Sequence, residues 1–317
     1  MTEVGIRGYA AYVPRNVLAT TAFGAEPPVA DRGGRAVASH DEDSVTLAVE
    51  AAGRLEASAD GPLLLATSEP PYLDKSSAAT VHAALELPTD RAALDLGGLR
   101  SGAVALSTAL ATGGTAVLAD VRTPAPGAPD ELAHGDGAAA FACGDGPGVA
   151  TVIGRAAATH ELLDRWRIPG DRHPTAWDER FTAEDLVPLL TETAAKALAE
   201  AGIERADHVV VACANRRASG PARKVLGSDG SDAQIEAMTG NLGAAQIGVL
   251  LADALDRSTP GQTILAVAAA DGADAVVLRV DADPAAHRGG PSVREQLADR
   301  RSITYDRFLR WRGILEI

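Results

Sequence analysis

The sequence ALDLGGLRSGAVAL, residues 93–106, joins two apolar runs through a glycine-rich turn. The first run predicts a strand over residues 92–96, and the spacing of apolar residues after the turn predicts a helix over residues 103–111. A strand that leads through glycines directly into a helix is the basic unit of α/β proteins. The stretch therefore indicates an α/β fold, and the rest of the chain is interpreted outward from it.

Further strands and helices alternate on both sides of this stretch. Predicted strands cover residues 4–14, 62–67, 115–119, 135–143, 208–214, 261–270 and 273–281. Predicted helices cover residues 41–57, 76–85, 182–201 and 240–256. This alternation predicts a mostly parallel sheet covered by helices. The same order of strand, loop and glycine-rich helix start recurs in both halves, which indicates an internal duplication. We therefore expect one half at residues 1–150, a second at 151–281, and an arginine-rich appendage at 282–317.

Composition excludes several classes of function. The formal net charge of −14 argues against non-specific binding to nucleic acid or to an anionic membrane. The sequence has no basic leader and no apolar run of about 18 residues, so a cytoplasmic protein is expected. Two cysteines, Cys143 and Cys213, are too few for a disulfide framework. No cysteine and histidine spacing is typical of zinc ligands, so we predict no metal site.

Six segments of the chain, in order, resemble the hydroxymethylglutaryl-CoA synthase and ketoacyl synthase-like branch of the thiolase superfamily. They are GIRGYAAYVPR (5–15), DEDSVTLAVEAA (41–52), LLLATSEPPYLDKSSAATV (63–81), ALDLGGLRSGAVAL (93–106), HGDGAAAFACGDG (134–146) and TGNLGAAQIGVLLADAL (239–255). The resemblance implies a thiolase-like five-layer αβαβα fold of two similar halves, usually dimeric. It also implies action on acyl thioesters of coenzyme A or of an acyl carrier protein, with the thioester as substrate and no separate cofactor.

Two catalytic residues of the resembled family are missing. The family's nucleophilic cysteine stands two residues before the glycine of the helix entry, and this position is Arg100. The family's histidine falls on Ala212, in the stretch Ala212-Cys213-Ala214-Asn215. An acyl-enzyme needs a thiolate, which arginine does not provide. We therefore expect no acyl-cysteine intermediate at this position.

Three residues are candidates for catalysis. Asn241 matches the family's asparagine that donates to a thioester or enolate oxygen, although an Asn-Leu-Gly sequence also suits a turn or cap. Glu69 matches the synthase branch's acid/base glutamate, and its alternative is an ordinary solvated carboxylate. A partly dry pocket would raise the pKa of such a carboxyl group. Tyr72 either donates a proton to a carbonyl or covers the loop.

Four more residues are candidates for substrate binding. Arg100 opposes the helix dipole, so it binds a carboxylate, phosphate or enolate, or else closes the site with a salt bridge. Ser101 and Asn215 flank the two altered positions. Cys213 is either a displaced nucleophile or a small core residue.

Two functions from different classes remain open. The first is an enzyme that forms or cleaves a carbon–carbon bond, or transfers an acyl group, without an acyl-cysteine. The second is a non-catalytic thiolase-like subunit that supports an active partner. A homodimer is expected, and the resemblance suggests a small zinc-ribbon/OB-fold partner that residues 302–317 would dock. Carrier-protein docking usually needs a basic patch, for which Arg216-Arg217 and Arg223-Lys224 are candidates.

Overall fold

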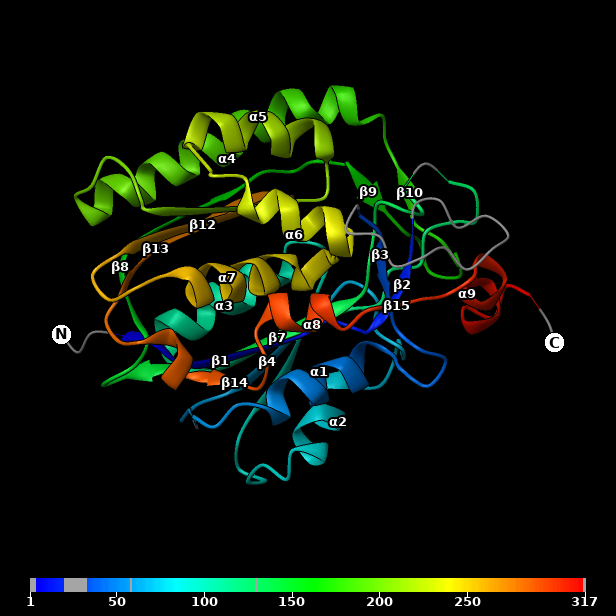
Figure 1. Ribbon diagram of the computed structural model, residues 1–317, viewed down its shortest axis with the longest axis horizontal. Helices are drawn as coiled ribbons and strands as arrows, with labels where there is room; N and C mark the ends of the chain where they lie inside the picture. Colours follow the sequence, from blue (N-terminus) through cyan, green and yellow to red (C-terminus); the bar gives the residue numbers. More distant parts are fainter. Residues whose placement is uncertain (1–3, 20–32, 58, 129, 316–317) are drawn as a thin grey trace.

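The computed structural model describes residues 4–19, 33–57, 59–128 and 130–315, and one large sheet runs through them (Figure 1). Its strands are β1 (Val4–Tyr12), β4 (Leu63–Thr67), β5 (Ala93–Gly97), β6 (Gly114–Asp120), β7 (Gly137–Asp145), β8 (Ala150–Thr159), β11 (His208–Cys213), β12 (Thr263–Ala270), β13 (Gly272–Val280) and β14 (Arg288–Gly289). The order is β11-β12-β13-β8-β1-β7-β6-β4-β5, and β14 pairs with β1. Two small sheets are formed by β2 (Asn16–Leu18), β3 (Arg35–Val37) and β15 (Arg301–Ser302), and by β9 (Arg165–Trp166) and β10 (Thr175–Ala176).

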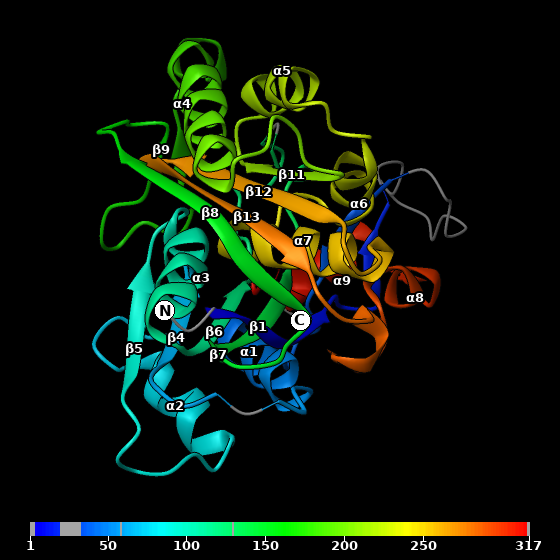
Figure 2. The same cartoon turned by 90° about the vertical axis from the view of Figure 1, so that its left-hand side faces the viewer.

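Helices cover and separate the two parts of the large sheet. They are α1 (Ser44–Gly53), α2 (Ser77–Ala84), α3 (Ser101–Thr112), α4 (Glu179–Ala201), α5 (Arg216–Leu226), α6 (Ser231–Thr239), α7 (Gln246–Arg257), α8 (Val293–Ala298) and α9 (Tyr305–Trp311), with 3₁₀ turns η1 (Gly243–Ala245) and η2 (Pro284–Ala286). Helices α3 and α7 lie between β11-β12-β13-β8 and β1-β7-β6-β4-β5, while α4 and α5 cover one outer face and α1 and α2 the other (Figure 2). The predicted five-layer αβαβα arrangement is therefore confirmed.

Three apolar clusters correspond to the contacts between these layers. The largest contains α3 and α7 side chains together with residues of both sheet parts, including Leu106, Leu250 and Phe141. A second joins α4 and α5 to the sheet, and a third joins α1 and α2 to it. These clusters are rich in alanine and valine, and small side chains let helices and strands approach closely. The core is thus built as the low aromatic content of the chain suggests.

The expectation of a mostly parallel sheet is wrong, because the sheet is mixed. Strands β4 and β5, β4 and β6, and β11 and β12 run parallel, whereas β7 pairs antiparallel with β1 and β6. Strand β13 is antiparallel to both β12 and β8. The tight turn at Gly272, where φ is +137°, permits the β12–β13 hairpin. Strand β8 escaped prediction because its half-exposed sequence, ATVIGRAAAT, is not a continuous apolar run.

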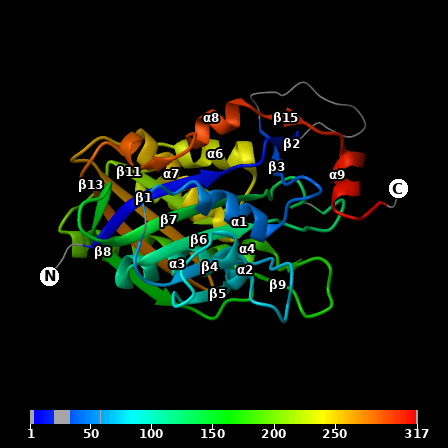
Figure 3. The same cartoon turned by 90° about the horizontal axis from the view of Figure 1, so that it is seen from below.

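Residues 282–317 are not the appendage that their composition suggested. Gly289 pairs with Ala10 of β1, and Val293 of α8 is buried in the largest apolar cluster. Phe308 of α9 is 2% exposed and lies under the Arg35 guanidinium, 4.7 Å from ring centroid to the guanidinium carbon. The segment carries buried apolar side chains between its arginines, Val293, Leu297 and Phe308 among them. Composition alone does not show this, which is why the segment was interpreted as an appendage. Figure 3 shows α8 and α9 running along one side of the molecule.

Helix α3 starts where it touches the loop after α6. A Cβ atom on Gly102 would lie 1.8 Å from the carbonyl oxygen of Ala244, so only glycine allows this approach. The predicted helix over residues 240–256 accordingly begins later, as a 3₁₀ turn followed by α7 at Gln246. The contact brings the first turn of α3 next to Asn241.

Two absences hold for the residues that the structure describes. Among them, no helix combines the length and apolar character needed to cross a membrane. No group of three or more histidine, cysteine, aspartate or glutamate side chains in that same part of the chain has the geometry of a metal site.

Candidate functional site

Three cavities meet at Leu99, which stands between β5 and α3. The Asn241 cavity, lined by Arg100, Ala212, Asn241 and Gln246 among others, has a volume of about 20 Å³. This is room for roughly one water molecule. The Glu69 pocket, lined by Glu69 and three arginines, has a volume of about 270 Å³. The Asn215 cavity, which Asp164 and Cys213 also line, has a volume of about 150 Å³.

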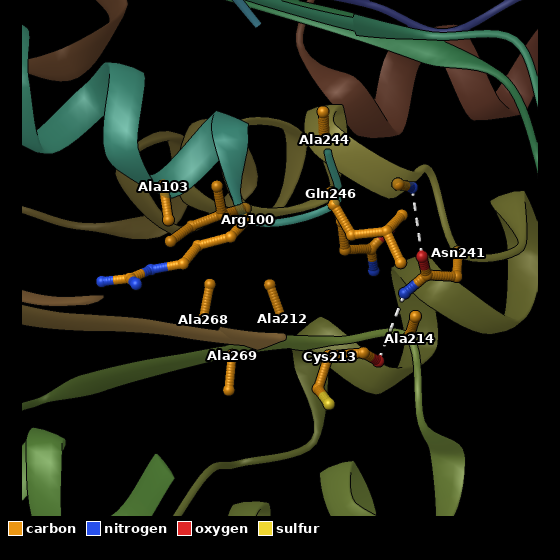
Figure 4. Close-up of a pocket in the computed structure, with 13 residues that line it drawn as sticks. Arg100, Ala103, Ala212, Cys213, Ala214, Asn241, Ala244, Gln246, Ala268 and Ala269 are labelled. Carbon is orange, nitrogen blue, oxygen red and sulfur yellow. Dashed lines mark hydrogen bonds between the residues drawn. The ribbon is translucent and has the colours of Figure 1, made fainter. Parts of the chain in front are cut away.

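Asn241 is 2% exposed and fixed at one end of the Asn241 cavity. Its Oδ1 accepts a hydrogen bond from the Gly243 N–H at 3.1 Å, and its Nδ2 donates to the Cys213 carbonyl at 3.3 Å (Figure 4). Its backbone N–H donates to the Ala133 carbonyl at 2.7 Å. Asn241 therefore stabilises a turn and also lines the cavity, because the turn holds its amide group at the cavity wall.

Gln246 is a cavity residue that the sequence analysis missed. Its Oε1 accepts a hydrogen bond from the Leu242 N–H at 2.7 Å, and the side chain is 3% exposed. Its Nε2 has no hydrogen-bond partner among the described residues. An unpaired buried donor costs free energy, so it needs an explanation. The signal in the sequence is a polar residue on the buried, apolar side of a predicted helix.

Arg100 lines the Asn241 cavity, but its guanidinium group points away from it (Figure 4). It is the N-cap residue of α3, and its Nε lies 2.8 Å from Asp274 Oδ2 on β13. Its Nη1 lies 3.3 Å from Thr159 Oγ1 at the end of β8. Figure 4 shows the guanidinium pointing away from Asn241. Of the two interpretations of this residue, the geometry is that of the salt bridge.

Leu99 and Ser101 flank Arg100 and have different surroundings. Leu99 lines all three cavities. Ser101 is 3% exposed, lines none of the three, and its Oγ has no hydrogen-bond partner within the described part of the chain. The side chain at the junction of the cavities is thus Leu99, and an alkyl group there offers no nucleophile.

Glu69 follows β4 and is held at the wall of the Glu69 pocket. Its backbone N–H donates to Thr67 Oγ1 at 3.1 Å, and its side chain is 8% exposed. One carboxylate oxygen lies 2.7 Å from Arg167 Nη1 and the other 3.8 Å from Arg122 Nη1. Burial raises the pKa of the Glu69 carboxyl group, and the charges of Arg122 and Arg167 oppose that rise. The acid/base role of Glu69 stays a prediction.

Asp120 connects the Glu69 pocket to the Asn241 cavity. It is 0% exposed, and its Oδ1 accepts hydrogen bonds from the Ser68 N–H at 2.7 Å and from Thr67 Oγ1 at 2.8 Å. Its Oδ2 accepts from the Ala244 N–H at 2.6 Å, three residues beyond Asn241. A single buried carboxylate thus fixes the loop before Glu69 against the loop after Asn241.

The remaining sequence candidates differ in their place: Cys213 lines the Asn241 and Asn215 cavities, and Asn215 lines the second of these. Cys213 packs into the apolar cluster of α4 and α5, and burial raises the pKa of its thiol to about 12. Asn215 is 0% exposed, caps α5 through the Arg217 and Ala218 N–H groups, and donates to Thr182 Oγ1 at 2.8 Å. Tyr72 is 54% exposed and lines none of the three cavities.

Comparisons with solved structures define the class of fold. A hydroxymethylglutaryl-CoA synthase complexed with CoA superposes with a TM-score of 0.79 over 96% of this chain and 89% of that one, at 15% identity. A 3-oxoacyl-(acyl carrier protein) synthase III from Pseudomonas aeruginosa gives a TM-score of 0.72 over 88% of this chain and 98% of that one, at 20% identity. The chain therefore shares the α/β fold of these proteins.

Sequence relatives narrow the class to a branch. The hydroxymethylglutaryl-CoA synthase of Methanopyrus kandleri is 29% identical, over 99% of this chain and 98% of its own length. That of Methanothermobacter thermautotrophicus is 27% identical, over 99% of both chains. No protein-family model matches the chain. The resemblance to the hydroxymethylglutaryl-CoA synthase and ketoacyl synthase-like branch is thus confirmed, and the comparisons support an enzyme of this type.

Proposed function

We propose that the protein forms or cleaves a carbon–carbon bond next to the carbonyl group of an acyl thioester, without an acyl-cysteine intermediate. The observation that carries the proposal is Glu69, a buried carboxyl group of raised pKa in the largest of the three cavities that Leu99 lines. Relatives named hydroxymethylglutaryl-CoA synthase support the substrate class. The absence of a thiolate from the wall of that pocket, where Leu99 stands, argues against covalent catalysis.

The proposed chemistry divides between the two sides of Leu99. In cleavage of a 3-hydroxyacyl thioester, the Glu69 carboxylate takes the hydroxyl proton and the bond between C2 and C3 breaks. The electron pair passes to the thioester as an enolate, which the Asn241 and Gln246 amides stabilise at its oxygen. Protonation of C2 by water completes the reaction. In the reverse direction, Glu69 delivers its proton to the new hydroxyl oxygen.

The experiment is a comparison of Glu69→Gln with Glu192→Gln, an exposed glutamate on α4. The probe is 3-hydroxy-3-methylglutaryl-CoA, whose cleavage gives acetyl-CoA and acetoacetate, separated by liquid chromatography. We expect Glu69→Gln to lose about 10²- to 10⁴-fold in turnover, the range of a positioned acid or base. Equal turnover of the two variants contradicts the proposal.

The non-catalytic subunit stays the second candidate because the Asn241 cavity holds only about 20 Å³. That volume admits no acyl chain without rearrangement. If neither the parent protein nor any variant cleaves the probe or condenses acetyl-CoA with acetoacetate, this candidate is favoured over the enzyme.

Two further proposals concern partners. Strand β5 is an edge of the large sheet and exposes Leu94 by 50%, which suits pairing with a second copy. Leu94→Lys should then convert a dimer to a monomer in light scattering. Helix α5 exposes Arg216, Arg217 and Lys224, a basic face for the phosphates of coenzyme A or for an acidic carrier protein. The zinc-ribbon/OB-fold partner stays a prediction.

A further inference from the structure

A further cavity lies where helix α9 meets the loop after β6 and the segment between β9 and β10. We call it the Phe308 cavity, and its volume is about 40 Å³. Its polar lining and its apolar lining include Arg122, Arg172, His173, Phe308, Arg312 and Ile314. Among the described residues, no acidic side chain lines this cavity. Three guanidinium groups from three distant segments thus meet at one small space.

Two of these guanidinium groups are balanced by carboxylates outside the lining. Arg122 lies 3.8 Å from both Asp120 and Glu69, and its side chain is 3% exposed. Arg312 pairs with Asp136, and its side chain is 8% exposed. These buried charges are therefore paired, as buried charges usually are. They bring hydrogen-bond donors to the cavity and no excess charge.

The third guanidinium group, that of Arg172, is held by backbone groups alone. Arg172 is exposed, and its Nη2 donates to the carbonyl oxygens of Arg312 and Gly313, each at 2.7 Å. No carboxylate of the described chain pairs with it, so its charge is not balanced within this part of the protein. The Nε atoms of Arg122 and Arg312 are buried and also lack a hydrogen-bond partner among the described residues. Unpaired buried donors at a cavity wall indicate a bound ion or water.

We propose that the Phe308 cavity binds a small monocarboxylate, at a site separate from the Glu69 pocket and the Asn241 cavity. One negative charge matches the single guanidinium group without a carboxylate partner. The planar donor fork of arginine matches a carboxylate group, and Phe308 and Ile314 provide an apolar wall for a short alkyl end. The volume corresponds to roughly three water molecules, which is room for an ion of the size of acetate. A phosphate dianion would bring one negative charge too many.

The proposed site would act on the Glu69 pocket through Arg122, which lines both cavities. A carboxylate bound next to Arg122 adds negative potential near Glu69, so it should raise the pKa of the Glu69 carboxyl group. It would also connect α9 to the segment between β9 and β10. The effect on Glu69 rests on the proposed function, whereas the binding of the carboxylate does not.

The test is saturation-transfer NMR on the full chain, with sodium acetate as the probe and acetamide as its neutral isostere. We expect transfer to the acetate methyl group and none to acetamide. Arg172→Met removes the unbalanced charge and leaves the buried ion pairs in place, so acetate should bind about tenfold more weakly or worse, the effect of one charge-assisted pair. Arg180→Met removes an exposed arginine paired with Asp178 and should bind acetate as the parent protein does.

A further variant separates this cavity from the Glu69 pocket. Arg167 lines the Glu69 pocket and not the Phe308 cavity, so Arg167→Met should keep acetate binding. Loss of binding in Arg167→Met but not in Arg172→Met would assign the anion to the Glu69 pocket and overturn the inference. Equal transfer to acetate and acetamide, or unchanged affinity in Arg172→Met, would leave the buried donors to water and overturn it too.

A competition experiment checks the class of ligand. Sodium phosphate at an equal concentration should not displace acetate, and displacement would overturn the assignment to a monocarboxylate. None of these measurements uses a thioester or turnover. Their failure would therefore leave the proposed function intact, and a failure of the proposed function would leave this site intact.

Discussion

The cavities on either side of Leu99 contrast in both volume and charge. The Asn241 cavity is small, about 20 Å³, and its wall is mostly apolar, with two amide side chains and Arg100, whose guanidinium pairs with Asp274. The Glu69 pocket is large, about 270 Å³, and its wall carries three arginines and a glutamate. The cavity at Ala212, which the resemblance aligns with the family's histidine, is thus the smaller one, and the larger space lies where the charges are. This difference is the reason why the proposed proton transfer is assigned to Glu69.

Removing Asp120, the carboxylate that holds the loops of the two cavities together, should have the largest effect, on the stability of the protein. Asp120→Ala leaves the Ser68 and Ala244 N–H groups without an acceptor and removes a buried charge next to Arg122. We expect the free energy of unfolding in urea to fall by about 3–5 kcal/mol. Asp74→Ala, on the exposed loop after β4, is the matched control. A loss below about 1 kcal/mol for Asp120→Ala would show that the two loops are held together by other contacts.

Removing an amide side chain from the Asn241 cavity should lower the turnover rate more than the stability of the protein. Gln246→Leu removes the buried Nε2 that has no partner in the described residues, together with the acceptor of the Leu242 N–H. Turnover should fall about 10²-fold, the usual cost of one oxyanion donor, while the unfolding free energy changes by less than about 2 kcal/mol. Gln234→Leu, exposed on α6, serves as control. An unchanged rate would remove Gln246 from the mechanism.

Removing a charge from the Glu69 pocket should shift the pH dependence of condensation activity. Glu69 faces Arg122, Arg167 and Asp120, and the arginines lower a pKa that burial raises. Arg167→Met removes a positive charge, so the Glu69 pKa should rise further. The fall of condensation activity at high pH, where the acid form is lost, should therefore shift to higher pH. A profile that stays in place, or moves to lower pH, contradicts the acid function of Glu69.

The smallest expected effect is the absence of a covalent adduct. Burial raises the pKa of the Cys213 thiol to about 12, so the thiol stays protonated at neutral pH. Intact-protein mass spectrometry after exposure to acetyl-CoA and acetoacetyl-CoA should show no acyl addition. An adduct that disappears in Cys213→Ala would restore a covalent mechanism with a relocated nucleophile.

Local patterns in the sequence predicted much of the fold. The strand at residues 62–67 and the helix at 182–201 lie within a few residues of β4 and α4, because their apolar spacing reflects burial in the layers. Strand direction was not predictable in this way, since pairing of β7 with both β1 and β6 depends on distant segments. Helix α5, whose sequence RRASGPARKVL is mostly polar, gave no apolar pattern to detect.

The candidate site was predicted in part. Glu69 and Asn241 lie on cavities that share Leu99, as their positions after a strand and before a helix indicated. The direction of the Arg100 side chain depends on Asp274, a contact across 174 residues that no local pattern records. Gln246 and the pocket arginines Arg122 and Arg165 were missed for the same reason. Their place in the candidate site depends on residues that are near in space and distant in sequence.

The ion pairs of α9 have a consequence for synthesis of the chain. Arg312 pairs with Asp136, a buried carboxylate that also accepts a hydrogen bond from the Arg122 N–H at 2.8 Å. Arg312 follows every other member of this group in the chain, so it leaves the ribosome last. Until then, Asp136 lacks one of its partners, and the Phe308 ring has only the Arg35 guanidinium over it and not that of Arg312. A chain that ends before Arg312 should therefore be bound by chaperones and cut by proteases more readily than the full chain. A chain that lacks an equally short piece of an exposed loop should be affected less.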